Sequence, residues 1–147
     1  MMKFKGRVVV PGTAKAEALV SRQGFNTLAS LQKSLMAGDK EAKCSDHGNP
    51  DILGKPITGK ALCLPQTIGS TTGGMILYCV ASMGLAPACL LFANQIDSLA
   101  AAGAALAAVW TESPMPTIDN LGESFLNAVQ TGMTIQVNEG GEVVLAP

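Results

Sequence analysis

Charged and aromatic residues are scarce in this chain of 147 residues. Only 14% of its residues are Asp, Glu, Lys or Arg, only 4% are Phe, Trp or Tyr, and the formal net charge is −1. So small a charge gives no electrostatic attraction to nucleic acid or to an anionic membrane, and so few aromatic rings do not form a surface for base stacking. We therefore expect neither nucleic acid nor a membrane as a partner.

Long apolar segments are also absent. No run approaches the roughly 20 residues that a membrane-spanning helix needs. The opening MMKFKGRVVVPG is too short and too soon interrupted for a secretion signal. The cytoplasm is the expected compartment.

Residues that commonly bind metal are few and scattered. Cys44 and His47 have the spacing of half a metal site, but His47 is the only histidine and no second pair lies nearby. Cys63, Cys79 and Cys89 lie in apolar runs, where cysteine behaves as a small buried hydrophobe. We expect free thiols, no metal bound by this chain alone, and His47 in a loop that faces a ligand or a partner.

Hydrophobic residues, by contrast, make up 48% of the chain. A chain of this length and composition can bury a sizeable core, and we expect one domain over residues 1–147. Apolar, alanine-rich stretches combined with so little charge also indicate that a partner covers part of the surface.

The first half of the chain predicts two strands, a helix and a loop. KFKGRVVVPG and AEALVS have the alternation of strands. Between Gly24 and Gly38, apolar residues recur at helical spacing and stop at a glycine, which predicts one short helix. The polar segment DKEAKCSDHGNPDILGKP predicts a loop on the surface.

The second half has a strand-helix-strand rhythm. It predicts strands at GKALCLP, ACLLFA and LAAVW, a helix from Ser70 to Met83, an alanine-rich helix from Ile96 to Ala105, an irregular connector at SPMPTI, a helix from Asp119 to Gly132, and a β-hairpin at TIQVNEGGEVVLA. Together the elements predict a mixed α/β domain in which a parallel sheet is capped by an antiparallel ribbon. Active sites of such sheets lie at the carboxyl ends of the parallel strands, and Gly69 and Ser70 fall at that edge.

The turn IGSTTGGM, residues 68–75, has three interpretations. Its glycines and the following helix N-terminus could hold a phosphate, although it is neither a Walker loop nor a dinucleotide fingerprint. Ser or Thr could simply cap the helix. Ser70 could also act as a base, if backbone amides and a cationic group from elsewhere stabilise its anion.

Other polar residues have simpler interpretations. Arg7 lies within an apolar strand, where a guanidinium needs an anionic partner, and a structural ion pair is favoured over substrate binding. Asp46 and Asp51 are interpreted as solvated or turn-forming residues of the loop.

Three segments together resemble the small subunit, or swivel domain, of the aconitase X enzymes. They are KGRVVVPGTAKAEALVS, NPDILGKPITGKALCLPQTIGSTTGGMIL and GLAPACLLFANQIDSLAAAGAALA, and the similarity covers about residues 5–110. The occurrence of all three segments in this order is specific for the family, whereas the Gly-Ser-Thr turn alone would not identify it.

The resemblance implies a three-layer swivelling β/β/α domain that docks on a large catalytic subunit to form a heterodimer or larger hetero-oligomer. The large subunit would carry iron or an iron-sulfur cluster, so this chain would be half an active site of a hydro-lyase, active only in the pair. By the same resemblance, Ser70 is the proton acceptor, Gly69 lets the turn approach the substrate, and Thr71 and Thr72 cap the helix or bind the substrate carboxylate.

Two dehydrations are associated with this family. The segment SRQGFNTLASLQKSLMAGDK is longer than the one expected of archaeal members, which favours dehydration of cis-3-hydroxy-L-proline to pyrroline-2-carboxylate. The alternative substrate is mevalonate 5-phosphate, for whose phosphate the chain shows no cationic cluster. A non-catalytic anion-binding or structural module is the further alternative.

Overall fold

The computed structural model describes residues 1–147, and its strands form one large sheet and one small sheet. The strands are β1 (Met2–Lys5), β2 (Arg7–Val10), β3 (Ala14–Val20), β4 (Phe25–Asn26), β5 (Ala61–Leu64), β6 (Thr67–Ile68), β7 (Cys89–Phe92), β8 (Thr117–Asp119), β9 (Thr134–Asn138) and β10 (Glu142–Ala146). The helices are α1 (Thr27–Ala37), α2 (Gly73–Ser82), α3 (Ser98–Trp110) and α4 (Glu123–Ala128). The eight-stranded sheet has the order β1-β10-β9-β3-β5-β7-β8-β2, and β4 pairs with β6.

Strand β3 joins two differently built halves of the large sheet. Residues 14–17 pair antiparallel with β9, whereas residues 18–20 pair parallel with β5. Strands β5, β7 and β8 continue the parallel half, and β9, β10 and β1 form an antiparallel ribbon. The predicted fold class, a central parallel sheet with an antiparallel ribbon, is therefore confirmed.

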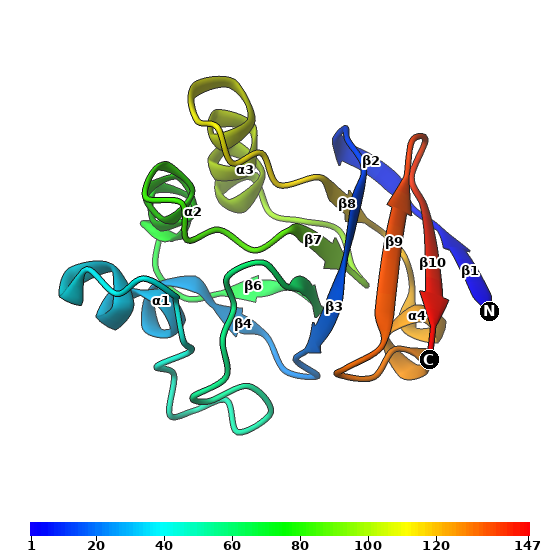
Figure 1. The fold of residues 1–147 in the computed structure, drawn as a ribbon, viewed down its shortest axis with the longest axis horizontal. Helices are drawn as coiled ribbons and strands as arrows, with labels where there is room; N and C mark the ends of the chain where they lie inside the picture. The colour runs from blue at the N-terminus through cyan, green and yellow to red at the C-terminus, as the bar shows by residue number, and fades with distance from the viewer.

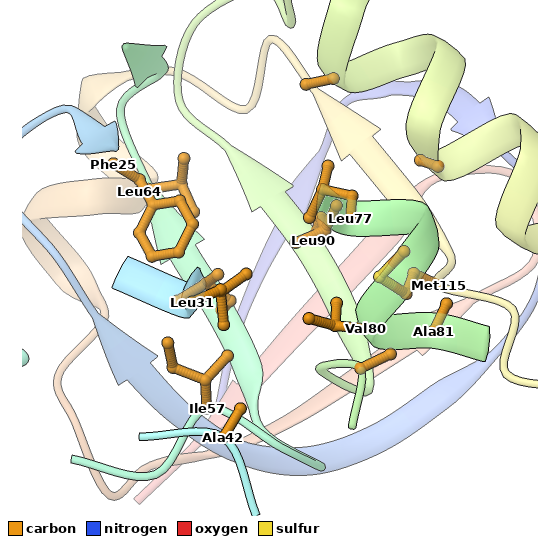
Figure 2. Close-up of a cluster of buried hydrophobic side chains, with 14 of the residues drawn as sticks. Phe25, Leu31, Ala42, Ile57, Leu64, Leu77, Val80, Ala81, Leu90 and Met115 are labelled. Carbon is orange, nitrogen blue, oxygen red and sulfur yellow. The ribbon is translucent and has the colours of Figure 1, made fainter. Parts of the chain in front are cut away.

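Two apolar cores lie on opposite faces of the parallel strands, because alternate residues of a strand point to opposite faces. Leu62 and Leu64 of β5 contribute to the core beneath the helices, which Figure 2 shows with Leu31, Leu77 and Leu90. Their neighbours in the strand, such as Cys63, contribute to the core on the other face. Full burial on both faces explains why β5 and β7 are continuous apolar runs.

The two faces have different covers. Helices α1, α2 and α3 lie side by side over one face, while the ribbon and α4 cover the other (Figure 1). This gives three layers, with the parallel strands in the middle.

The N-terminal segment forms two strands rather than the single strand that its alternation predicts. The chain breaks at Gly6, so that β1 joins one edge of the large sheet and β2 the other. A Cβ on Gly6 would lie 2.4 Å from the carbonyl oxygen of Asp119. Only glycine allows this approach, and periodicity alone does not report it.

Helix α3 extends further than predicted, and the prediction of a strand at LAAVW is wrong. These residues form the last turns of α3, which ends at Trp110 with Thr111 as its C-cap. The run of alanines before them propagates the helix, and one β-branched valine does not interrupt it.

Two predictions for the segment after α3 are also wrong. Residues 117–119 form strand β8 instead of part of an irregular connector, and Asp119 ends that strand instead of opening a helix. Helix α4 begins at Glu123 and ends at Ala128, short of Gly132. The strand is only three residues long and fully buried, so it lacks the alternation by which strands are recognised.

Residues 39–56 form an irregular segment as predicted, but not one confined to the surface. Ala42, Cys44 and Ile52 are buried against the core beneath α1. The predicted helix before this segment and the C-terminal hairpin are both confirmed, as α1 and as β9 with β10. No helix has the length and apolar character needed to cross a membrane.

Candidate active site

The glycine-hydroxyl turn lies between the short strand β6 and helix α2, just beyond the carboxyl end of β5. Gly69 has a φ of +101°, and a Cβ at this position would lie 2.7 Å from the side-chain amide nitrogen of Asn26. Asn26 is itself fixed, since its Oδ1 accepts a hydrogen bond of 3.1 Å from the backbone N–H of Ala29 and caps α1. Glycine is therefore required for the turn to pack against the start of α1.

The Ser70 hydroxyl is exposed and takes part in a local hydrogen-bond network. Its Oγ accepts from the backbone N–H of Thr72 at 3.1 Å and lies 2.9 Å from the Thr72 Oγ1. The Ser70 carbonyl accepts from the N–H of Gly73, where α2 begins. Two potential donors thus point at one serine oxygen beside a helix N-terminus, an arrangement that favours negative charge on that oxygen.

A cavity of about 270 Å³ opens beside Ser70. Its walls are formed by Thr27, Thr67, Ile68, Gly69, Ser70, Gly73, Gly74, Asp97, Leu99 and Ala100. The first turns of α2 and α3 both contribute to the walls. The N–H groups of Leu99 and Ala100 in α3 are already bound by the Asp97 carboxylate, so it is the N-terminus of α2, which has no side-chain cap, that favours an anionic ligand. The walls include no Lys or Arg, so the cavity itself offers a substrate anion no cationic side chain.

Asp97 stands at the α3 side of the cavity and caps that helix. Its carboxylate accepts hydrogen bonds from the backbone N–H groups of Leu99 and Ala100 at 3.0 and 3.1 Å, and from the Thr67 hydroxyl. Partial burial opposes ionisation, but these hydrogen bonds outweigh it and hold the pKa of Asp97 below its ordinary value. A satisfied carboxylate of this kind ties β6 to α3 and fixes the wall opposite Ser70.

The structure separates the residues predicted for the site into two groups. Ser70 and Gly69 line the cavity, whereas Thr71 and Thr72 are exposed and lie outside its walls. Thr72 is the N-cap of α2 but makes no capping hydrogen bond with its side chain. Sequence reasoning missed Asp97 and Thr67 as site residues. For Asp97 a signal existed, since it stands at the N-cap position of an alanine-rich helix.

Arg7 forms the structural ion pair that was predicted. Its Nε and Nη2 donate to the two carboxylate oxygens of Asp119 at 2.9 and 2.6 Å. Asp119 is fully buried and also accepts from the backbone N–H of Ile96. The guanidinium is therefore engaged in joining β2 to β8, away from the Ser70 cavity.

Cys44 and His47 do not converge. The Cys44 side chain belongs to the core beneath α1, while His47 is exposed. No group of three or more His, Cys, Asp or Glu side chains could hold a metal ion. The residues of this chain therefore do not fit an iron centre.

The cysteines are free thiols, as predicted. Burial raises the pKa of Cys89 to about 12 and raises the pKa of Cys63 as well. Thiols with pKa values so far above neutral are not nucleophiles, and we assign them to packing.

A model of the aconitase X swivel domain matches residues 3–146. The chain belongs to the aconitase X swivel-domain family. Among its relatives, the phosphomevalonate dehydratase small subunit of Thermococcus kodakarensis is 32% identical over 143 residues, which cover 97% of this chain and 95% of the relative. The subunit of the same name from Archaeoglobus fulgidus is 30% identical over 137 residues, which cover 93% and 92% of the two chains.

A solved structure agrees with this assignment. The crystal structure of Thermococcus kodakaraensis aconitase X in its holo-form superimposes with a TM-score of 0.83 at 27% identity and covers 100% of both chains. The predicted family and the predicted class of enzyme, a hydro-lyase subunit, are thereby confirmed.

Proposed function

We propose that this swivel domain is the small subunit of a dehydratase acting on mevalonate 5-phosphate. The observation that carries the proposal is similarity along almost the whole of both chains to relatives named phosphomevalonate dehydratase small subunit. This similarity favours mevalonate 5-phosphate, the alternative substrate considered in the sequence analysis, over cis-3-hydroxy-L-proline. The argument from a longer segment in residues 21–40 loses its force, since the archaeal relatives and the solved structure match this chain end to end.

Within this reaction we assign the proton transfer to Ser70. Mevalonate 5-phosphate has a hydroxyl on the carbon next to the one that bears the carboxylate. Loss of water requires that a proton leave the carbon beside the carboxylate while the C–O bond breaks and a C=C bond forms. The hydrogen bond from the Thr72 N–H to the Ser70 oxygen and the place of Ser70 in the cavity wall support its role as the acceptor of that proton.

The remaining cavity residues receive positioning roles. Gly69 brings the turn close to the substrate, and the N-terminus of α2 faces the substrate carboxylate. Thr71 and Thr72 are exposed and lie outside the cavity walls, and closure by a partner would bring them to the substrate. The phosphate requires cations that the cavity walls lack, and we assign these to the large subunit.

The large subunit is also the proposed holder of iron or an iron-sulfur cluster, since no group of side chains in this chain fits a metal. The active unit would then be a hetero-oligomer in the cytoplasm, with its catalytic site between the two chains.

The test is to co-express this chain with its own large subunit and to assay the pair anaerobically on mevalonate 5-phosphate and on cis-3-hydroxy-L-proline, with each subunit alone as control. We expect dehydration of mevalonate 5-phosphate by the pair only. Turnover of cis-3-hydroxy-L-proline instead would reverse the substrate assignment. An inert pair together with micromolar binding of phosphate by this chain alone would favour the anion-binding module.

A further inference from the structure

The outward face of α3 is apolar along its whole length. Leu99, Ala102, Leu106 and Val109 recur at intervals of three and four residues, are all exposed, and are followed by exposed Trp110. The exposed fraction reaches 74% for Val109 and 68% for Trp110. We call these five residues the α3 stripe. It extends about 16 Å along the helix, at 1.5 Å per residue.

No charged side chain interrupts this surface. The chain has no charged residue from Ala61 to Ile96 and none from Ser98 to Thr111, so neither α2 nor α3 bears a charge. A helix that faces water ordinarily carries charged residues opposite its buried face. Large apolar residues at this spacing are instead typical of a helix face that packs against a second protein surface.

The stripe is held rigidly in its outward orientation. Gly103, which follows Leu99 by about one turn on the side of α3 that faces α2, touches α2 so closely that a Cβ there would lie 2.2 Å from the Gly74 carbonyl oxygen. At the end of the stripe, the Trp110 ring packs edge-on against Tyr78 of α2, with ring centroids 6.2 Å apart. A fixed, exposed tryptophan has the character of an interface hot spot, because little side-chain entropy remains to be lost on binding.

The position of Leu99 identifies what covers the stripe. Leu99 is the first residue of the stripe and also lines the Ser70 cavity, as does Ile68, which is 49% exposed. The cavity has no cation in its walls and the chain has no metal-binding group. For the proposed dehydration a second protein would have to supply both. Whatever covers the cavity contacts Leu99, and α3 continues from that point without a charge.

We propose that the large subunit docks along the α3 stripe, from Leu99 at the cavity to Trp110 at the far end of the helix, through an apolar groove of its own. This inference rests on the proposed function for the identity of the partner. A second copy of this chain would cover the stripe equally well, but it would bring neither cations nor metal ligands to the cavity.

The test uses Leu106→Glu and Val109→Glu, which place a charge on the stripe away from the cavity. Met36→Glu is the matched control, because Met36 is 78% exposed on α1 and α2 lies between α1 and α3. We measure binding of each purified small subunit to its large subunit, with circular dichroism as the check on folding. Burying an unpaired charge in the docked face is expected to weaken binding by at least about tenfold, while Met36→Glu binds as the wild type does.

Wild-type binding by both stripe variants would overturn the proposal. So would variants that keep the heterodimer but halve the mass of the assembly, since the stripe would then hold a second copy. If the glutamate variants do not fold, Trp110→Ala and Val109→Ala replace them, with weaker binding still expected. Binding is measured without substrate, and the Ser70→Ala variant should bind the large subunit normally. A wild-type pair that forms but dehydrates neither substrate would count against the proposed function and leave the docking surface unaffected.

Discussion

Gly74 of α2 and Gly103 of α3 touch backbone to backbone. A Cβ on Gly74 would lie 2.1 Å from the carbonyl oxygen of Leu99, and one on Gly103 would lie 2.2 Å from that of Gly74. This contact sets the two helix N-termini side by side, and both contribute to the Ser70 cavity. The width of the cavity therefore depends on two positions that have no side chain.

Alanine at either of these glycines should force the helices apart. For Gly74→Ala and Gly103→Ala we expect a loss of at least about 2 kcal/mol in the free energy of unfolding, as overpacked cores show. Gly73→Ala is the control, since its Cβ would meet Thr27 at an ordinary 3.5 Å, and a gain of up to about 1 kcal/mol is expected there. Thermal unfolding of the three variants measures the difference. Equal stability of Gly74→Ala and Gly73→Ala would contradict the close packing.

Replacement of Ser70 should affect turnover without affecting the fold. Ser70→Ala removes the proposed proton acceptor, and we expect kcat of the reconstituted pair to fall by about 10²- to 10⁴-fold with an unchanged melting temperature. Ser82→Ala is the control, because Ser82 is the last residue of α2 and lies outside the cavity walls. Full activity of Ser70→Ala would rule out the assignment.

The Asp97 carboxylate should make stability depend on pH in the acid range. Because its pKa in the folded state is lowered from the ordinary 3.8, its charge stabilises the protein at pH values above 3.8, and this contribution is lost as the pH falls through the lowered pKa. Asp97→Asn keeps a capping side chain without the charge, so wild type should be the more stable above pH 4 and the difference should vanish in stronger acid.

Chemical denaturation of both proteins across this pH range makes the comparison. Asp97→Ala, which also removes the cap, should be less stable than Asp97→Asn by about 1 kcal/mol at every pH. A constant difference between wild type and Asp97→Asn down to the most acidic folded condition would show that the carboxylate charge is not involved.

Cys89 should be inert in the folded protein. With a pKa raised to about 12 by burial, its thiolate is nearly absent at pH 8, and iodoacetamide reacts only with thiolates. Mass spectrometry of the alkylated native protein should find Cys79, the one cysteine that is partly exposed, modified well before Cys63 and Cys89. In denaturant all four should react. Rapid native labelling of Cys89 would mean that β7 opens readily.

Local patterns predicted the C-terminal hairpin, in which more and less buried residues alternate, and the strands β5 and β7, which are short continuous apolar runs. They also predicted the position of the Ser70 turn at the carboxyl edge of β5. The fold class followed from their order along the chain.

The errors have a common physical cause, which is contact between segments distant in the sequence. The sequence around Asp119 is typical of a helix N-cap, but in the structure Asp119 pairs with Arg7, 112 residues earlier, across two strands of the sheet. Ile52 reads as part of a surface loop, but it fills a space beneath α1. The wall of the cavity opposite Ser70 was missed for the same reason, since Thr67 and Asp97 meet only because β6 and α3 are neighbours.

The pairing of β1 with β10 has a consequence for the order of folding. Met2 lies opposite Leu145, so β1 bonds to a strand that follows it at a very large separation in the sequence (Figure 1). Until β9 and β10 have been synthesised the ribbon cannot form, and one face of the parallel strands lacks its full cover. Such distant pairing is slow to form, and in the interval the nascent chain exposes unpaired strands that are prone to aggregate. The large sheet is therefore expected to be completed only after β10 has been synthesised.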